Sequence, residues 1–282
     1  MDALSGALLV WFILTAMSLI LAGWDLARNT PVSWVQKLAW LLVIAYTGPV
    51  GLVVFLLSCR SPGEDMHDAF TKPTWKQAVN SEMHCLAGDA TGIVVAAAVL
   101  SAFTIEWWWE VTIEYVAAWI TGLFLFQALM MRSMFSSYGQ ALKRTVFVET
   151  VSMNMVMVGM IPTMILLAAL WPQSTSPWHI SFWFRMGLAC IAGGLTAFPI
   201  NHWLVAKGLK HGCMTVGMDH SKMDHSGHDM AAMDHSKMDH SEHAMSMKAL
   251  PPSQQALWIT LTVIALAGAV GLTAWLRPLV AT

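Results

Sequence analysis

A stretch near the C-terminal end of the chain repeats metal-binding side chains at a fixed spacing. Residues 218–230, MDHSKMDHSGHDM, recur as residues 233–245, MDHSKMDHSEHAM. Thioethers and imidazoles favour soft ions such as Cu(I) and Ag(I), and the Asp residues make Zn(II) a further candidate. A solvated low-complexity linker is the alternative interpretation. The predicted ligands are Met218, His220, Met223, His225, His228, Met230, Met233, His235, Met238, His240, His243, Met245 and Met247.

A second group of reactive side chains lies in an apolar run, in the sequence EMHCLAGDATG at residues 82–92. At 100° per residue, His84, Cys85 and Asp89 share an arc of about 140° with Gly88 and Gly92. The two glycines form a GxxxG pair that permits another helix to approach closely. Ionisable groups inside a bilayer are costly and mark candidate functional sites, so His84, Cys85 and Asp89 are predicted to bind metal.

A third group forms a row on one helix face. Glu149, Met153, Met157, Met160 and Met164 follow one another at intervals of 4, 4, 3 and 4 residues, which keeps them within roughly 80° around a helix. Successive side chains of the row are about 5 to 6 Å apart along the helix axis, which is close enough for a soft cation to pass between weak sites. The competing interpretation is that Met fills an irregular core. The combination with a carboxylate favours a metal pathway headed by Glu149.

Further soft ligands follow at the end of the sixth apolar run. His202, His211, Cys213 and Met214 are candidate ligands that connect the membrane portion to the repeats. A histidine at the membrane interface followed by a flexible linker explains these residues nearly as well as metal binding does. The four cysteines show no CxxC or other short pairing, so no disulfide framework is indicated.

The elements that must position these ligands are membrane helices. Of the 282 residues, 56% are hydrophobic and 11% are charged, whereas roughly a quarter are charged in soluble domains. A net charge of −2 leaves no basic surface for nucleic acid. Apolar runs without barrel-type alternation predict an all-α polytopic membrane helical bundle of about seven transmembrane helices. The predicted spans are 4–26, 35–57, 83–104, 111–131, 146–170, 182–206 and 255–276.

An odd number of spans places the two termini on opposite faces. The face that carries more Lys and Arg is then cytoplasmic, with the N-terminus and the Met/His-rich loop on it and the C-terminus in the periplasm of a bacterial inner membrane. On that face we expect Cys59, His84, Cys85, Asp89 and Glu149 to gather beside the loop. The predicted divisions are a six-helix membrane bundle at 1–206, the Met/His loop at 207–250, and a seventh helix with the C-terminus at 251–282.

Three stretches resemble an uncharacterised family of bacterial multi-span membrane proteins, described as a domain of unknown function. They are MHCLAGDATGI, VETVSMNMVMVGMIPTM and FPINHWLVAKGLKHGCM, at residues 83–93, 148–164 and 198–214. The resemblance covers most of residues 35–276 and implies a helical membrane fold without indicating an activity. The element MDHSKMDH separately resembles Met/His segments of bacterial copper-resistance proteins, which implies copper handling.

Together these features predict a transporter, not an enzyme, that moves Cu(I), with Ag(I) or zinc as alternative ions. The loop would capture metal, and Cys85, Asp89 and Glu149 would bind it or carry a counter-moving proton. A membrane-anchored chaperone, assembly or storage factor that hands copper to a chaperone or oxidase is the first alternative. An oxidoreductase that binds haem through His84 and His202, or holds copper as a redox centre, is the second. The expected partners are the metal ion and the lipid bilayer, and the oligomeric state stays open.

Overall fold

The structure is a computed structural model that describes residues 3–63, 65–131, 137–213, 215 and 250–280. Within this part of the chain six helical segments are long and apolar enough to cross a membrane. An all-α, multi-pass membrane bundle is thus confirmed. The segments are α1 (Ala3–Arg28), α5 (Thr74–Leu100), α6 (Trp107–Ile120) continued by the π-helical η1 (Thr121–Gln127) and by α7 (Ala128–Met131), α8 (Tyr138–Leu170), α9 (Ile180–Ala206) and α10 (Pro252–Val280).

The predicted span 35–57 is divided into two short helices, α2 (Trp34–Thr47) and α3 (Pro49–Ser58). Gly48 separates them with φ 59°, a conformation that glycine adopts without a Cβ clash. Pro49 has no N–H and therefore fits the first turn of the new helix. At 1.5 Å per residue the helices are about 21 and 15 Å long. Each is therefore shorter than a hydrocarbon core of about 30 Å.

Hydrogen bonds place the start of α2 and the end of α3 at the same level. The side-chain oxygen of Asn80 accepts from Gln36 Nε2 at 3.1 Å and from Trp40 Nε1 at 3.2 Å, and its amide nitrogen donates to the Ser58 carbonyl at 2.9 Å. Arg60 forms an ion pair with Asp25, near the end of α1, at 3.1 Å. The chain thus returns to the face from which it entered. We call α2 and α3 the re-entrant hairpin, and the described part of the chain therefore holds six helices long and apolar enough to cross a membrane, where the sequence predicted seven.

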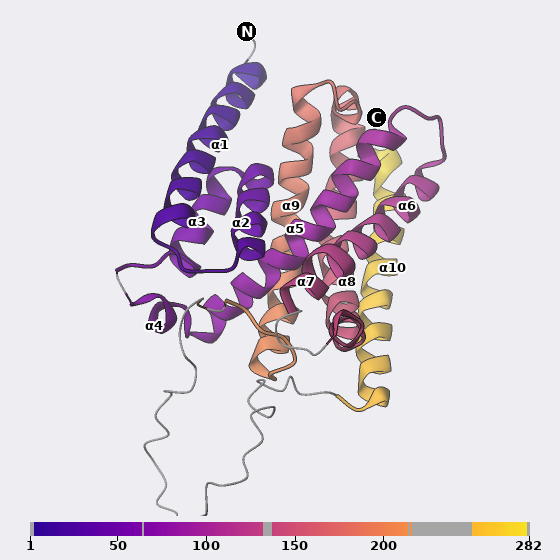
Figure 1. Ribbon diagram of the computed structural model, residues 1–282. Helices are drawn as coiled ribbons and strands as arrows, with labels where there is room; N and C mark the ends of the chain where they lie inside the picture. Colours follow the sequence, from indigo (N-terminus) through magenta and orange to yellow (C-terminus); the bar gives the residue numbers. More distant parts are fainter. Residues whose placement is uncertain (1–2, 64, 132–136, 214, 216–249, 281–282) are drawn as a thin grey trace, which may run out of the picture.

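Six crossings bring the two termini to one end of the bundle (Figure 1). We call this the terminal end. The opposite end, the loop end, holds the end of α9, the start of α10 and the short helix α4 (His67–Thr71). The expectation that the N-terminus shares a face with the Met/His loop is therefore wrong, because both flanks of residues 216–249 lie at the loop end. The reason is the hairpin, which reverses the direction of every later helix relative to α1.

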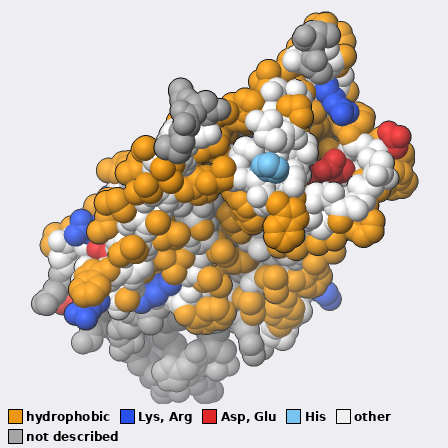
Figure 2. All heavy atoms as spheres, turned by 90° about the horizontal axis from the view of Figure 1, so that it is seen from above, with side chains coloured by type: hydrophobic (Ala, Val, Ile, Leu, Met, Phe, Trp, Pro, Cys, Tyr) orange, Lys and Arg blue, Asp and Glu red, His pale blue; other side chains and the backbone are white. Residues whose placement is uncertain are grey.

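Helix α5 is the centre of the bundle. In its most apolar 18-residue window 72% of residues are buried, against 17% in α1 and 11% in α10. A Cβ on Gly88 would lie 2.6 Å from the Gly122 Cα, and one on Gly92 would lie 2.6 Å from the Ala117 carbonyl oxygen. The predicted GxxxG contact is thus present, between α5 and the α6–η1 segment. Hydrophobic side chains dominate the surface seen from the terminal end, and charged side chains are sparse (Figure 2).

The re-entrant hairpin makes a direct prediction about accessibility. Arg28 and Lys72 are exposed at the loop end and Thr104 is exposed at the terminal end. An impermeant maleimide should therefore label Arg28→Cys and Lys72→Cys from the same side of oriented vesicles, and Thr104→Cys from the other. The parent protein, whose four cysteines are buried, is the unlabelled control. Labelling of Arg28→Cys and Lys72→Cys from opposite sides would restore the seven-span topology.

Candidate functional site

A polar cluster lies buried in the half of the bundle nearer the loop end. Its members come from α5, η1, α8, α9 and the chain that follows α9, and each is at most 3% exposed. Polar groups inside a bilayer must find their partners within the protein, so this concentration calls for a functional explanation. We name it the Cys85 cluster, and it consists of Cys85, Asp89, Gln127, Glu149, Ser152, Asn201 and Lys210.

The ammonium of Lys210 connects three elements of the Cys85 cluster. Its Nζ donates to Asn201 Oδ1 at 2.7 Å, to Cys85 Sγ at 2.9 Å and to Ser152 Oγ at 3.4 Å. The Cys85 thiol in turn donates to Glu149 Oε2 at 2.8 Å. All three N–H donors of the ammonium are therefore used, and the thiol links the cation to a carboxyl group.

Two carboxyl groups face each other in the cluster. A Cβ added to Gly122 would collide with both Asp89 Oδ1 and Glu149 Oε1, so these oxygens converge over the glycine. Gly122 lies in η1, and π-helical turns are frequent at functional sites. Among the described residues no hydrogen-bond donor reaches Asp89 Oδ1, Asp89 Oδ2 or Glu149 Oε1. Buried carboxyl groups without donors either share protons or bind a cation.

The charges of the cluster limit what it can do. One ammonium neutralises one of the three acidic groups, Cys85, Asp89 and Glu149, at a time. The other two must hold protons or a second cation, since an uncompensated charge costs several kcal/mol in such a site. The arrangement can therefore exchange protons for a small cation.

The sequence predicted a site of His84, Cys85, Asp89 and Glu149, and the structure brings three of these together. His84 is buried as well, but neither of its ring nitrogens has a hydrogen-bond partner among the described residues. Lys210 was missed, because a lysine beyond a helix end resembles an ordinary interfacial charge. Gly208 was the available signal: its φ of 68° ends α9 and turns the chain back toward the bundle.

The predicted methionine row is buried. Met153, Met157, Met160 and Met164 are 0%, 1%, 0% and 6% exposed, as expected for one inward face. The row begins one turn after Glu149 and ends at Met164, which lines a cavity of about 180 Å³ at the terminal end. Charged side chains also line this cavity: Glu110, Glu114, Arg185 and Arg277. Met186 and Cys190 lie in the same buried core as the row, whereas Met17 is 53% exposed.

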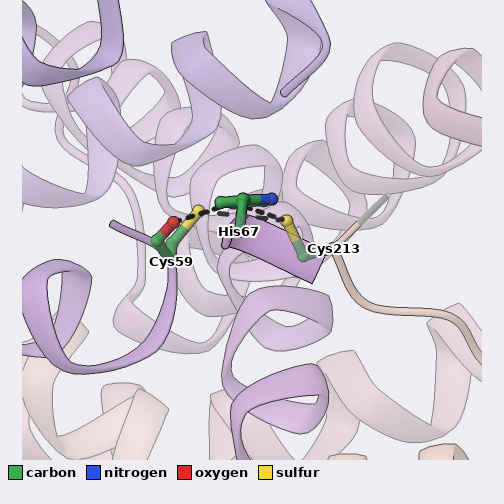
Figure 3. A group of neighbouring side chains, drawn as sticks. All are labelled: Cys59, His67 and Cys213. Atoms are coloured by element: carbon green, nitrogen blue, oxygen red, sulfur yellow. Dashed lines mark hydrogen bonds between the residues drawn. The ribbon is translucent and has the colours of Figure 1, made fainter. Parts of the chain in front are cut away.

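A second group of metal-ligand side chains lies at the loop end, outside the six crossing helices. Cys59, His67 and Cys213 are buried and point toward one another (Figure 3). The two sulfurs are 4.0 Å apart, and Cys213 Sγ lies 3.8 Å from His67 Nε2. We call these residues the Cys2His trio. The sequence had placed Cys59 and Cys213 at one face but did not identify His67.

The environment of the trio favours one thiolate. The hydrogen bond from Cys59 and the neighbouring His67 lower the pKa of Cys213 to about 6. Burial, together with Cys213, raises the pKa of Cys59 well above its ordinary value. Burial acts to lower the pKa of His67, but the Cys213 sulfur and the Cys59 carbonyl outweigh it and the pKa is raised. At neutral pH, Cys213 is therefore the ionised sulfur, and thiolates are the form that binds metals.

One short segment serves both groups. We call residues 207–215, which follow α9, the strap. Lys210 of the strap enters the Cys85 cluster, and Cys213 joins the trio. Between them Gly212 packs so closely on Gln77 that a Cβ would collide with its carbonyl oxygen. At its end Thr215 forms a β-bridge with Val32, which fixes the strap to the loop after α1.

The remaining predicted ligands fall outside both groups. His202 is half-buried, and its ring packs against Phe198 at 6.0 Å between centroids. His211 is half-buried, with no partner for Nε2 among the described residues. Met214 and the predicted ligands from Met218 to Met247 lie outside the described residues.

Comparison with known proteins identifies one similarity. Residues 74–210 match a family described as "Domain of unknown function (DUF4396)". The match is narrower than the expected resemblance over residues 35–276, and no link to copper-resistance proteins accompanies it. It includes every member of the Cys85 cluster and excludes all three residues of the Cys2His trio. No curated protein and no solved structure matches the chain.

Lys210 should matter for stability as well as for chemistry. Lys210→Met removes the ammonium and leaves the acidic groups of the cluster without a counter-charge, so we expect a loss of about 3 kcal/mol, at the low end for a broken buried pair because the carboxyl groups can take up protons. Thermal unfolding in detergent measures the change. Lys207→Met, on the same strap but exposed, should leave the unfolding temperature unchanged. Equal effects of the two substitutions would show that the ammonium does not hold the cluster together.

Proposed function

We propose that this protein moves a soft monovalent cation, Cu(I) and by the same chemistry Ag(I), across a bacterial inner membrane. The observation that carries the proposal is a continuous line of ligands. The row from Met153 to Met164 starts beside the Cys85 cluster and ends at the cavity of the terminal end. Thioethers hold soft ions weakly, and weak, repeated sites are what conduction requires.

The Cys85 cluster supplies the charge balance for entry. In the metal-free protein two of its acidic groups must be protonated, because Lys210 compensates only one. When a monovalent cation binds to the Cys85 sulfur and the Glu149 or Asp89 oxygens, one proton leaves and the total charge stays constant. The nearby ammonium of Lys210, 2.9 Å from the sulfur, favours the thiolate that a soft ion needs. Entry of metal is therefore proposed to be coupled to release of a proton.

The distribution of basic residues supports a cytoplasmic loop end. With six crossings, the end of α1 with Arg28 and the start of α2 with Lys37 lie on the same side as the ends of α3 and α9, which are followed by Arg60, Lys207 and Lys210. Arg277 lies in the last turn of α10, toward the terminal end. Cytoplasmic segments carry the excess of Lys and Arg. We therefore place the strap and the Met/His loop in the cytoplasm, and both termini on the periplasmic side. The loop would then collect metal from the cytoplasm.

The methionine row is tested by a substitution that keeps its volume. Met157→Leu with Met160→Leu preserves hydrophobicity but removes two thioethers, so the protein should fold while Ag(I) flux into proteoliposomes falls at least tenfold. The matched control is Met17→Leu with Met155→Leu, which changes a lipid-exposed and a half-buried Met outside the row. If flux in the row variant equals flux in the control variant, the row is core packing and not a pathway.

A second candidate function is metal delivery or storage, in which the membrane helices act as an anchor. The observation that favours it is the Cys2His trio, which lies outside the crossing helices and directly before the Met/His loop.

Deletion of residues 218–247 separates the two functions. A transporter should keep its Ag(I) flux at saturating metal, since the cluster and the row are intact, and should lose flux only at low metal concentration. A delivery or storage protein should show no flux with or without the segment, and it should lose most of its bound metal on deletion. Elemental analysis of both purified forms measures the second quantity.

A further inference from the structure

The spacing of the Cys2His trio matches the spacing that a three-coordinate metal imposes. Zinc bonds to sulfur and nitrogen, about 2.3 and 2.0 to 2.1 Å long, set the scale for a small d10 ion. At 120° in a plane, bonds of these lengths hold two sulfurs about 4.0 Å apart and a sulfur and a nitrogen about 3.8 Å apart. The observed separations are 4.0 Å between Cys59 Sγ and Cys213 Sγ, and 3.8 Å between Cys213 Sγ and His67 Nε2. All three ligand atoms lie within 4.8 Å of one another.

We infer that Cys59, His67 and Cys213 form a binding site for one thiophilic d10 cation, Cu(I) or Ag(I), at the loop end. Two sulfurs and one imidazole are a soft ligand set, and three ligands suit these ions. Zn(II) takes four ligands in structural sites, and among the described residues no fourth His, Cys, Asp or Glu joins the group. The inference deepens the proposed function and rests on it only for onward movement of the ion.

The hydrogen bonds of His67 are compatible with metal binding. Nε2 now lies 2.9 Å from the Cys59 carbonyl oxygen, to which it donates, and Nδ1 lies 2.8 Å from Thr215 Oγ1. Binding through Nε2 requires the proton to move from Nε2 to Nδ1, and the ring already places Nε2 3.8 Å from Cys213 Sγ. A hydroxyl can donate or accept, so Thr215 satisfies Nδ1 in both states. A hydrogen bond of this kind fixes the orientation of a ligating imidazole.

The site lies between the proposed collector and the proposed pathway. Cys213 is five residues before Met218, the first ligand of the repeat, so an ion held by the loop stays at high effective concentration near the trio. In the other direction Cys213 is three residues after Lys210, which enters the Cys85 cluster on the same strap. We therefore assign the trio as the loading site from which the ion passes to the cluster.

The test uses the full-length protein, purified anaerobically in detergent and titrated with Cu(I). Residues 216–249 contain no cysteine, so thiolate-to-copper charge-transfer absorption reports only the cysteine sites. Cys85 of the proposed pathway can also bind Cu(I), so the titrated full-length protein carries Cys85→Ser. We expect its charge-transfer absorption to reach a plateau, and Cys213→Ser in the same background should abolish it. Because Cys213→Ser also alters the strap, His67→Gln provides an independent variant, and it should weaken Cu(I) binding at least tenfold while two thiols remain.

Two other cysteines provide matched controls. Cys190→Ser removes a buried thiol of the core and should leave the absorption of the Cys85→Ser protein unchanged. Cys85→Ser by itself removes the thiol of the proposed pathway and should leave the absorption of the trio in place. Absorption that survives Cys213→Ser in the Cys85→Ser background, or that is lost in Cys85→Ser alone, would overturn the assignment, as would a Cys59–Cys213 disulfide in the anaerobic protein. If the unsubstituted protein shows this absorption but no Ag(I) flux in proteoliposomes, the transport proposal alone is refuted, so the two failures are distinguishable.

Discussion

A single buried ammonium organises the interior of this protein. Lys210 reaches into a membrane bundle where an unpaired charge is too costly to persist, so every element around it must supply a partner. Cys85 from α5, Ser152 from α8 and Asn201 from α9 accept its three hydrogen bonds. The same requirement fixes the strap, because Lys210 cannot reach the cluster unless the chain turns back directly after α9.

The topology follows from a second requirement, which is that a short helix cannot cross the bilayer. The re-entrant hairpin returns to its own face, and Asn80 satisfies both of its ends from α5. Most of the basic residues then lie toward the loop end, apart from Arg185 and Arg277, and the termini lie at the other end (Figure 1). The reversal also sets the direction of α5, α8 and α9, so that Cys85, Glu149 and Asn201 approach the strap from the same side.

The two candidate sites differ in the chemistry they support. In the Cys85 cluster an ammonium competes with any incoming cation, which suits exchange and passage. In the Cys2His trio the nearest groups are two sulfurs, an imidazole and a hydroxyl, which suits retention of a soft ion. The strap contributes Cys213 to the trio and Lys210 to the Cys85 cluster. Metal binding at the trio and the position of Lys210 in the cluster therefore depend on the same short backbone segment.

The sequence by itself determined the helical membrane class, the inward row from Met153 to Met164, and the placement of Cys85 and Glu149 toward the same end of the bundle. Those features depend on hydropathy and on 3.6-residue periodicity, which are local properties. Only the tertiary structure decided that residues 35–57 form a hairpin, that His67 completes the trio, and that Lys210 enters the bundle. Each of these depends on contacts between distant segments, such as Asn80 with Ser58 or Lys210 with Cys85, which no local pattern encodes.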